Sequence, residues 1–129
     1  MKNLIRGFAL VEVVIVIILL SGSLLVFLEA LRQAKSLQIK SEIITTQSIL
    51  LHDKINELRS IDFVDINQQN DYINFPNYPT YSYSFNVSYL NDNLDIVDAS
   101  TNMKRIDLNI KHNNSSYPLI SESFIISNL

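Results

Sequence analysis

Hydrophobic residues form one unbroken block near the start of the chain and periodic patterns after it. From Phe8 to Leu28 the sequence reads FALVEVVIVIILLSGSLLVFL, with a single charged residue and no proline. A helix of these 21 residues rises about 1.5 Å per residue and covers roughly 32 Å, the thickness of the hydrocarbon layer of a membrane. Lipid also enforces helix, because every backbone N–H there must be bonded within the segment. The block therefore predicts a transmembrane helix over residues 8–28.

After Leu28 the apolar residues narrow to one stripe. Its members recur at spacings of seven, seven, four and three residues, with two serines between them: Leu37, Ile44, Leu51, Ile55 and Leu58, with Ser41 and Ser48. The charged residues are expected off this stripe: Lys40, Glu42, Asp53, Lys54 and Glu57. The spacing predicts an amphipathic continuation of the helix over residues 29–59, since no glycine follows Gly22 and the first proline is Pro76.

Alternation with a period of two marks the rest of the chain, residues 60–129. Aromatic and apolar residues alternate with Ser and Asn over residues 81–89, and a second alternation covers residues 106–110. A third strand is expected at about Leu119–Ser127, and Leu94–Val97 is a short additional candidate. The aromatic row is interpreted as core that packs on the helix rather than as a ligand-stacking surface.

Segments without such patterns predict loops and turns. Residues Asp62–Pro79 are expected to form a loop because two prolines near its end disfavour helix. Asn91–Asn93 is expected to be a turn, with Asn and Asp taking the positive-φ positions that glycine usually takes, and Asn113–Ser116 is expected to be a second turn.

The apolar face of the resulting antiparallel meander needs a cover, and the stripe over Leu37–Leu58 is the only apolar stripe that the sequence offers. The sequence therefore predicts an α+β fold, in which a long N-terminal helix, transmembrane in its first half and amphipathic in its second, packs on a small antiparallel sheet. The sheet would form the head, residues 60–129.

Composition and charge exclude several kinds of site. The chain has 129 residues, no Cys and a net charge of −3, so a disulfide framework, a thiolate nucleophile and a Cys-based metal site are excluded. Residues 1–59 carry seven Lys/Arg and five Asp/Glu, whereas residues 60–129 carry three and eight. This asymmetry suggests a membrane-proximal part and a solvated part, and direct nucleic-acid binding is not expected.

Glu12 is the exceptional residue of the apolar block. A carboxylate deep in a bilayer costs on the order of 3 kcal/mol, and a charged residue at such a position usually has a function and a partner. An ordinary secretory signal peptide would use Lys2 and Arg6 as its basic region and be cut near Ser21–Ser23, but the apolar run resumes after that site. A single-span anchor that keeps Met1 is a further alternative.

The stretch KNLIRGFALVE over Lys2–Glu12, followed at once by aliphatic residues, resembles the leader and the cleavage and methylation site of type IV pilin-like proteins. This family includes major pilins, minor pilins and the pseudopilins of type II secretion, and the resemblance covers about residues 1–40. It implies that residues 1–7 are a leader peptide cut after Gly7 by a prepilin peptidase. Phe8 would then be the first mature residue and would be N-methylated.

The resemblance also implies a structural subunit and not an enzyme. The subunit would lie in the bacterial inner membrane with its C-terminal head in the periplasm, and would be incorporated into a type IV pilus or a type II secretion pseudopilus. The implied partners are prepilin peptidase, sister subunits in the filament, an assembly platform protein and inner-membrane lipid. The chain has Glu29 where many major pilins carry proline and Ser21 where they often carry glycine. These departures, with the small size and the missing Cys, favour a minor pilin or a minor pseudopilin.

Electrostatics gives Glu12 a role in the filament register. Cleavage frees an α-amino group on Phe8, which is mostly protonated at neutral pH, and N-methylation keeps its charge. Between staggered subunits, Glu12 of one chain would pair with the Phe8 amine of another, which removes the desolvation cost that each charge bears alone in lipid. The candidate residues are therefore Gly7 and Phe8 for cleavage and methylation and Glu12 for filament register.

No other group of residues predicts chemistry. His52 and His112 are far apart in sequence and are expected to be solvated on the surface. Several oxygen-bearing side chains offer ligands for Ca²⁺, but they lack a central glycine and a well-placed glutamate: Asn91, Asp92, Asn93, Asp95 and Asp98. No nucleophile–base pair is evident, so neither catalysis nor a cofactor is expected. The alternative function is a secreted soluble binding module released by an ordinary signal peptidase.

Overall fold

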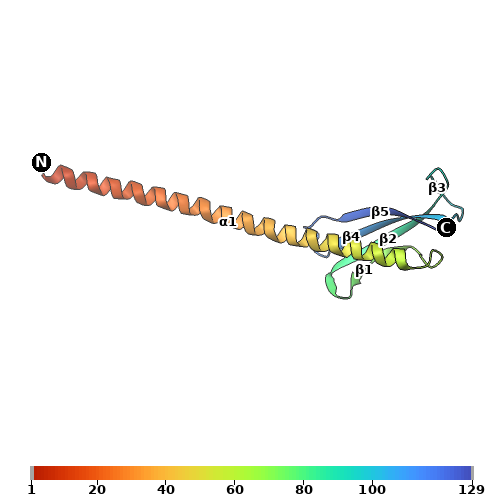
Figure 1. Ribbon diagram of the computed structural model, residues 1–129. Coiled ribbons are helices and arrows are strands. Elements are labelled where there is room, and N and C mark those ends of the chain that lie inside the picture. Colours follow the sequence, from red (N-terminus) through yellow and green to blue (C-terminus); the bar gives the residue numbers. More distant parts are fainter. Residues whose placement is uncertain (1, 129) are drawn as a thin grey trace. The chain divides into compact units, whose positions relative to one another are not determined.

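The computed structural model describes the backbone of residues 2–128 and the side chains of residues 9–128, and it confirms the α+β fold (Figure 1). The chain divides into two compact units, Met1–Ile39 and Lys40–Leu129. We call the second unit the head; it includes the C-terminal part of the helix as well as residues 60–129. One helix is followed by five strands: α1 (Lys2–Ser60), β1 (Gln69–Phe75), β2 (Tyr78–Leu90), β3 (Ile96–Val97), β4 (Met103–His112) and β5 (Ile120–Ser127).

Helix α1 confirms the expected continuous helix over residues 8–59 and also includes residues 2–7. Within the first unit its apolar side chains are exposed, and none of the most apolar 18-residue window is buried inside the protein. By length and composition this segment is apolar enough to cross a membrane once. A helix that is apolar all round and finds no cover in its own chain needs a lipid or protein environment.

The sheet is antiparallel throughout and has the order β1-β2-β4-β5, with β3 paired to the end of β2. The central pair has a regular register from Tyr81 opposite His112 to Leu90 opposite Met103. Because opposite residues point to the same face, the aromatic row of β2 lies on the same face as the apolar row of β4. These strands and the short β3 confirm the period-two predictions.

The prediction of a loop over Asp62–Pro79 is wrong for much of its length. Residues Gln69–Phe75 form β1, and β2 begins at Tyr78. The sequence pattern gave no signal for β1 because it is an edge strand whose five central side chains are all exposed. Its pairing with β2 also contains two register shifts, which break any regular alternation.

The core of the head lies between the C-terminal part of α1 and the sheet. The helix supplies buried side chains on one face: Leu51, Ile55 and Leu58 follow one another at spacings of four and three residues, and Leu50 lies next to Leu51. The sheet supplies the fully buried Ile106, Leu108 and Ile110 of β4. Tyr83 and Phe85 of β2 are half-buried and pack against this core with their rings nearly parallel. The aromatic row is thus core, as expected.

Two expectations about the helical stripe are wrong. Leu37 is 67% exposed and belongs to the first unit, so it makes no part of the core. Lys54 was expected off the stripe but lies on it and is buried. Its ammonium group is 4.2 Å from the centre of the Tyr83 ring and 2.8 Å from a carboxylate oxygen of Glu57. The long stem of a lysine can occupy an apolar stripe when its charged end finds such partners.

The turn after β2 also differs from expectation. Asn and Asp were expected to take the positive-φ positions, yet among the described residues the only positive φ belongs to Leu94, at 67°. Asn91 instead closes the turn through its side chain, because its Oδ1 accepts hydrogen bonds from the backbone N–H groups of Asn93 and Asp95 at 2.9 and 2.8 Å. Leu94 therefore carries backbone strain that glycine would not.

Lys104 connects the sheet to the segment after α1. It is only 3% exposed, and its ammonium group donates to the backbone carbonyls of Phe63 and Ile66 at 2.6 and 3.0 Å. The same group lies 4.6 Å from the centre of the Phe63 ring and 5.4 Å from that of Tyr89. Carbonyl dipoles and ring faces thus replace the water that a buried ammonium loses.

We expect Lys104→Ala to lower the free energy of unfolding of the head by about 3 kcal/mol, because two carbonyls lose a charged donor and a cavity opens. Lys104→Met keeps the apolar part of the side chain and removes the ammonium group. It should therefore still lower the free energy of unfolding by at least half as much as Lys104→Ala. The control is Arg105→Ala on the opposite face of β4, where a surface ion pair with Asp107 contributes at most about 1 kcal/mol. Denaturant unfolding followed by near-ultraviolet circular dichroism measures all three. Equal losses for Lys104→Ala and Arg105→Ala would contradict this role of Lys104.

Replacing Leu94 by glycine should stabilise the head by about 0.5–1 kcal/mol, because the strained φ is relieved at a side chain that is mostly exposed. The matched control is Ile96→Gly, two residues away in β3, where no positive φ is present and glycine only weakens the strand. Thermal unfolding of the two variants compares them directly. The strain argument fails if Leu94→Gly is destabilised as much as Ile96→Gly.

Candidate functional site

The first candidate site surrounds Glu12 in the apolar part of α1. Its carboxylate is exposed on the helix surface, and its neighbours in the sequence are aliphatic. Val11, Ile15 and Val16 line, together with Glu12, an open hollow of about 430 Å³. The site is therefore a single acidic group among the apolar side chains of one exposed helix.

Glu12 lacks a charged partner in the part of the chain whose side chains are described, residues 9–128. The ion pairs formed there are Lys54–Glu57 and Arg105–Asp107, both in the head. A carboxylate in an apolar environment is costly unless a cation neutralises it, and the cost rises with depth in a membrane. In such an environment, a compensating charge would have to come from outside residues 9–128 or from another molecule.

The backbone of Gly7 and Phe8 belongs to α1, but the Phe8 side chain lies outside the described side chains, residues 9–128. Phe8 precedes Glu12 by four residues, about one helical turn, so the two positions are on the same face of the helix. Their roles in cleavage and methylation stay predictions from the sequence.

The alternative cleavage region, Ser21–Ser23, lies inside the same helix. The Ser21 hydroxyl donates to the carbonyl of Ile17 at 2.7 Å, and the Ser23 hydroxyl donates to the carbonyl of Leu20 at 2.9 Å. Both hydroxyls are thereby satisfied without water, as an apolar environment requires. Gly22 has open space where a Cβ would lie, so nothing packs against it within the chain.

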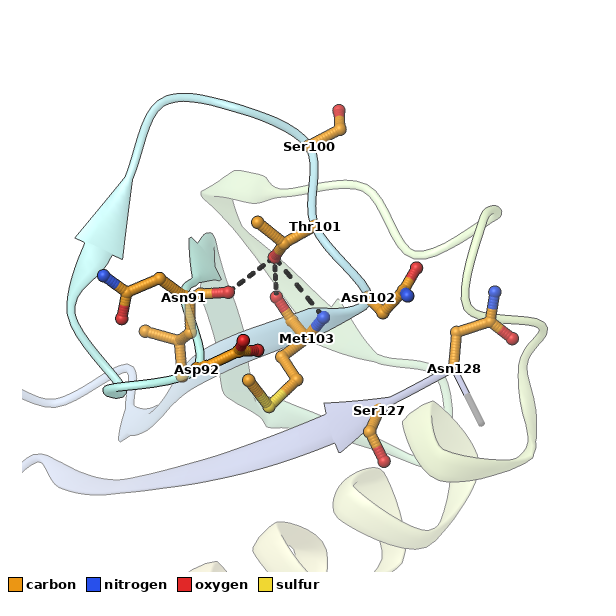
Figure 2. Close-up of a pocket in the computed structure, with 9 residues that line it drawn as sticks. Asn91, Asp92, Ser100, Thr101, Asn102, Met103, Ser127 and Asn128 are labelled. Carbon is orange, nitrogen blue, oxygen red and sulfur yellow. Dashed lines mark hydrogen bonds between the residues drawn. The ribbon is translucent and has the colours of Figure 1, made fainter.

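A second candidate is a hollow of about 700 Å³ at the end of the sheet (Figure 2). Three separate segments line it, and six of the nine lining residues have amide or hydroxyl side chains: Leu90–Asp92, Ser100–Met103 and Ser127–Asn128. The Thr101 hydroxyl is 2.6 Å from the carbonyl of Leu90 and 3.0 Å from that of Met103, so it joins β2 to the start of β4. Sequence reasoning missed this hollow because no local pattern marks three segments that meet only in the folded head.

Among the oxygen-bearing side chains between β2 and β4, the carboxylates are not clustered. In the described part of the chain, no group of three or more His, Cys, Asp or Glu side chains is close enough to hold a metal ion. The Asn91 side-chain oxygen is already used by two backbone N–H groups of the turn. Asp92, Asp95 and Asp98 are exposed instead and make this end of the head acidic.

One of the two histidines differs from expectation. His52 is exposed, as expected, but His112 is half-buried between Tyr81 and Tyr117, each ring 5.0 Å away and edge-on. Its Nδ1 accepts a hydrogen bond from the backbone N–H of Asn114 at 3.0 Å, so it fixes the turn between β4 and β5. The physical reason is the register of β4, which places residue 112 beside Tyr81.

The described residues thus present one unusual group, an uncompensated carboxylate on an apolar helix, and an acidic end of the head. Comparison of the chain with protein-family models, with curated proteins and with solved structures finds no match.

Proposed function

We propose that this protein is a structural subunit of a type IV pilin-like filament. The observation that carries the proposal is Glu12, an exposed carboxylate on an apolar helix that has no charged partner among residues 9–128. A filament of staggered copies supplies the partner, because the amine freed on Phe8 by leader cleavage is positive and lies on the same helix face one turn earlier. The charge pair then fixes how far neighbouring subunits are shifted along the filament axis.

The division of the chain supports the same proposal. In the first unit, the segment from Phe8 to Leu28 is apolar on all sides apart from Glu12, and none of the most apolar 18-residue window of the helix is buried, which suits both a membrane and the core of a helical filament. The head has its own core and a polar outer sheet face, where Arg105, Asp107 and Ser123 form a hydrogen-bonded network. Such a head is suited to water and to contacts with neighbouring subunits.

In this proposal the helix is stored in the bacterial inner membrane, with the head in the periplasm, before the subunit enters a type IV pilus or a type II secretion pseudopilus. The departures at Glu29 and Ser21 favour a minor subunit. Prepilin peptidase, sister subunits and an assembly platform protein are the proposed partners. The helix continues without a break through Ser21–Ser23, which favours this assignment over a secreted module released by signal peptidase.

Mass spectrometry of the mature N-terminus tests the proposal directly. We expect the chain to begin with N-methylated Phe8, because the proposed peptidase cuts after Gly7. A chain that begins near Ser23 or later would identify a secreted module, and a chain that keeps Met1 would identify a plain membrane anchor. Either of these two results overturns the filament proposal.

Replacing Glu12 by leucine should leave leader cleavage intact but lower incorporation into filaments by at least about tenfold, because the register pair contributes on the order of 1.4 kcal/mol or more. The matched control is Glu29→Leu, the same change at another exposed carboxylate of the first unit. Glu29 already has a local partner, since Gln33 donates a hydrogen bond to it at 3.3 Å. Immunoblots of sheared filaments and of membranes measure incorporation and cleavage. Wild-type incorporation of Glu12→Leu would remove the register role.

A further inference from the structure

The turn between β2 and β3 projects apolar side chains into solvent. Leu94 and Ile96 are 58% and 63% exposed, and we call residues 92–96 the hairpin tip. The tip carries the exposed acidic residues Asp92 and Asp95, neither of which forms an ion pair within residues 9–128. The tip is thus a small apolar surface with negative charge beside it.

Leu94 contributes little to the stability of the head. Its backbone is held at a positive φ, which is unfavourable for leucine, and its side chain remains mostly exposed. Two large aliphatic side chains held outward at the end of a strand pair are more easily understood as a contact for another molecule than as part of the fold.

A complementary surface lies on the first unit of the chain. With 100° per residue, Leu31, Arg32, Lys35 and Ile39 fall within a 100° sector of α1, and we call these four residues the basic stem. Leu31 is 50% exposed and Ile39 is 41% exposed. Arg32 and Lys35 are exposed, and they form no ion pair with any residue from 9 to 128.

We propose that the hairpin tip of one copy docks on the basic stem of a second copy of this chain. Leu94 and Ile96 would lie against Leu31 and Ile39, while the aspartates of the tip would face Arg32 and Lys35. The inference deepens the proposed function and rests on it for the staggered arrangement of copies. It adds that at least two copies of this chain are neighbours in the assembly.

Charge and size favour a second copy as the occupant. The tip is acidic, so it is repelled by an anionic membrane surface, whereas the stem supplies two cations. Leu31 and Ile39 are eight residues apart, about 12 Å along the helix. The Cα atoms of Leu94 and Ile96 are at most about 7 Å apart, which is the reach of two residues of fully extended chain. The apolar pair of the tip therefore fits between the ends of the stem, with the basic residues alongside.

Disulfide cross-linking tests the contact in full-length protein, and the absence of native cysteine makes each introduced thiol unique. Two differently tagged chains are co-produced in the source cells, one with Asn93→Cys in the tip and one with Ser36→Cys beside the stem. Neither change removes a proposed contact. In the matched control, the second chain carries Leu37→Cys in place of Ser36→Cys. Position 37 lies on the same helical turn, but on the face of α1 opposite to the basic stem.

Mild oxidation should give at least about tenfold more doubly tagged dimer for the 93–36 pair than for the 93–37 pair. Equal yields would overturn the proposal. If lipid headgroups cover the stem instead, the thiol at position 36 is shielded from a water-soluble maleimide and forms no dimer with position 93, and this result also overturns it.

Charge exchange gives a second, independent measurement. Asp92→Lys with Asp95→Lys should lower the 93–36 dimer severalfold, and adding Arg32→Glu with Lys35→Glu on the other chain should restore it. Asp53→Lys, at an exposed position in the helical part of the head, is the control and should change nothing. Failure of the exchange to restore the dimer would contradict the proposed pairing.

The result is separable from the fate of the filament proposal. A mature chain that begins at Phe8 but gives no specific 93–36 dimer leaves the filament proposal in place and refutes the docking contact. A specific 93–36 dimer from a chain that retains Met1 refutes the filament proposal and supports the docking contact.

Discussion

A carboxylate on an otherwise apolar helix surface requires a positive charge close by, and this requirement shapes everything proposed for the first unit of the chain. Glu12 is exposed, has aliphatic neighbours and has no charged partner among residues 9–128. Since an unpaired carboxylate has a high free energy in lipid, a lipid-embedded helix with Glu12 is stable only when another group supplies a positive charge. In the proposed filament, the amine that leader cleavage would free on Phe8 is the nearest such group in the sequence, and assembly with other copies would bring it within reach.

In the head, two buried lysines find partners for their ammonium groups within the head itself. Lys104 places its ammonium group on two backbone carbonyls and near two aromatic rings. Lys54 uses one ring and one carboxylate. In both cases the tertiary structure replaces lost hydration with dipoles, ring faces or an opposite charge, which is what permits lysine in an apolar layer. These two buried cations of the head are therefore compensated within the head, whereas Glu12 of the first unit has no charged partner among residues 9–128.

The ends of the sheet differ in their chemistry. At the turn between β4 and β5, His112 and Asn114 hold the backbone, and Gln47 of α1, fully buried, donates to the carbonyl of Pro118 at 3.0 Å. At the opposite end, the hairpin tip presents aspartates and two aliphatic side chains that nothing in the head covers. Hydrogen bonds of Asn91 and Thr101 hold the backbone at the tip end as well, but there Leu94 and Ile96 remain mostly exposed. This contrast underlies the inference that the tip docks on a basic stem of another copy.

Local sequence patterns suffice to predict the long helix, its apolar first part, the regular strands β2, β4 and β5 and the exceptional character of Glu12, because each depends on a local period or on a single unusual residue. They also predict the α+β class, since one apolar stripe and one apolar sheet face must cover each other. The folded arrangement alone explains four further features: the burial of Lys54, the edge strand β1, the strained turn at Leu94 and the hollow around Thr101. These features depend on which residues face one another across distant segments. Hydrophobic periodicity carries no such information, because a side chain's burial and partners are set by its neighbours in space.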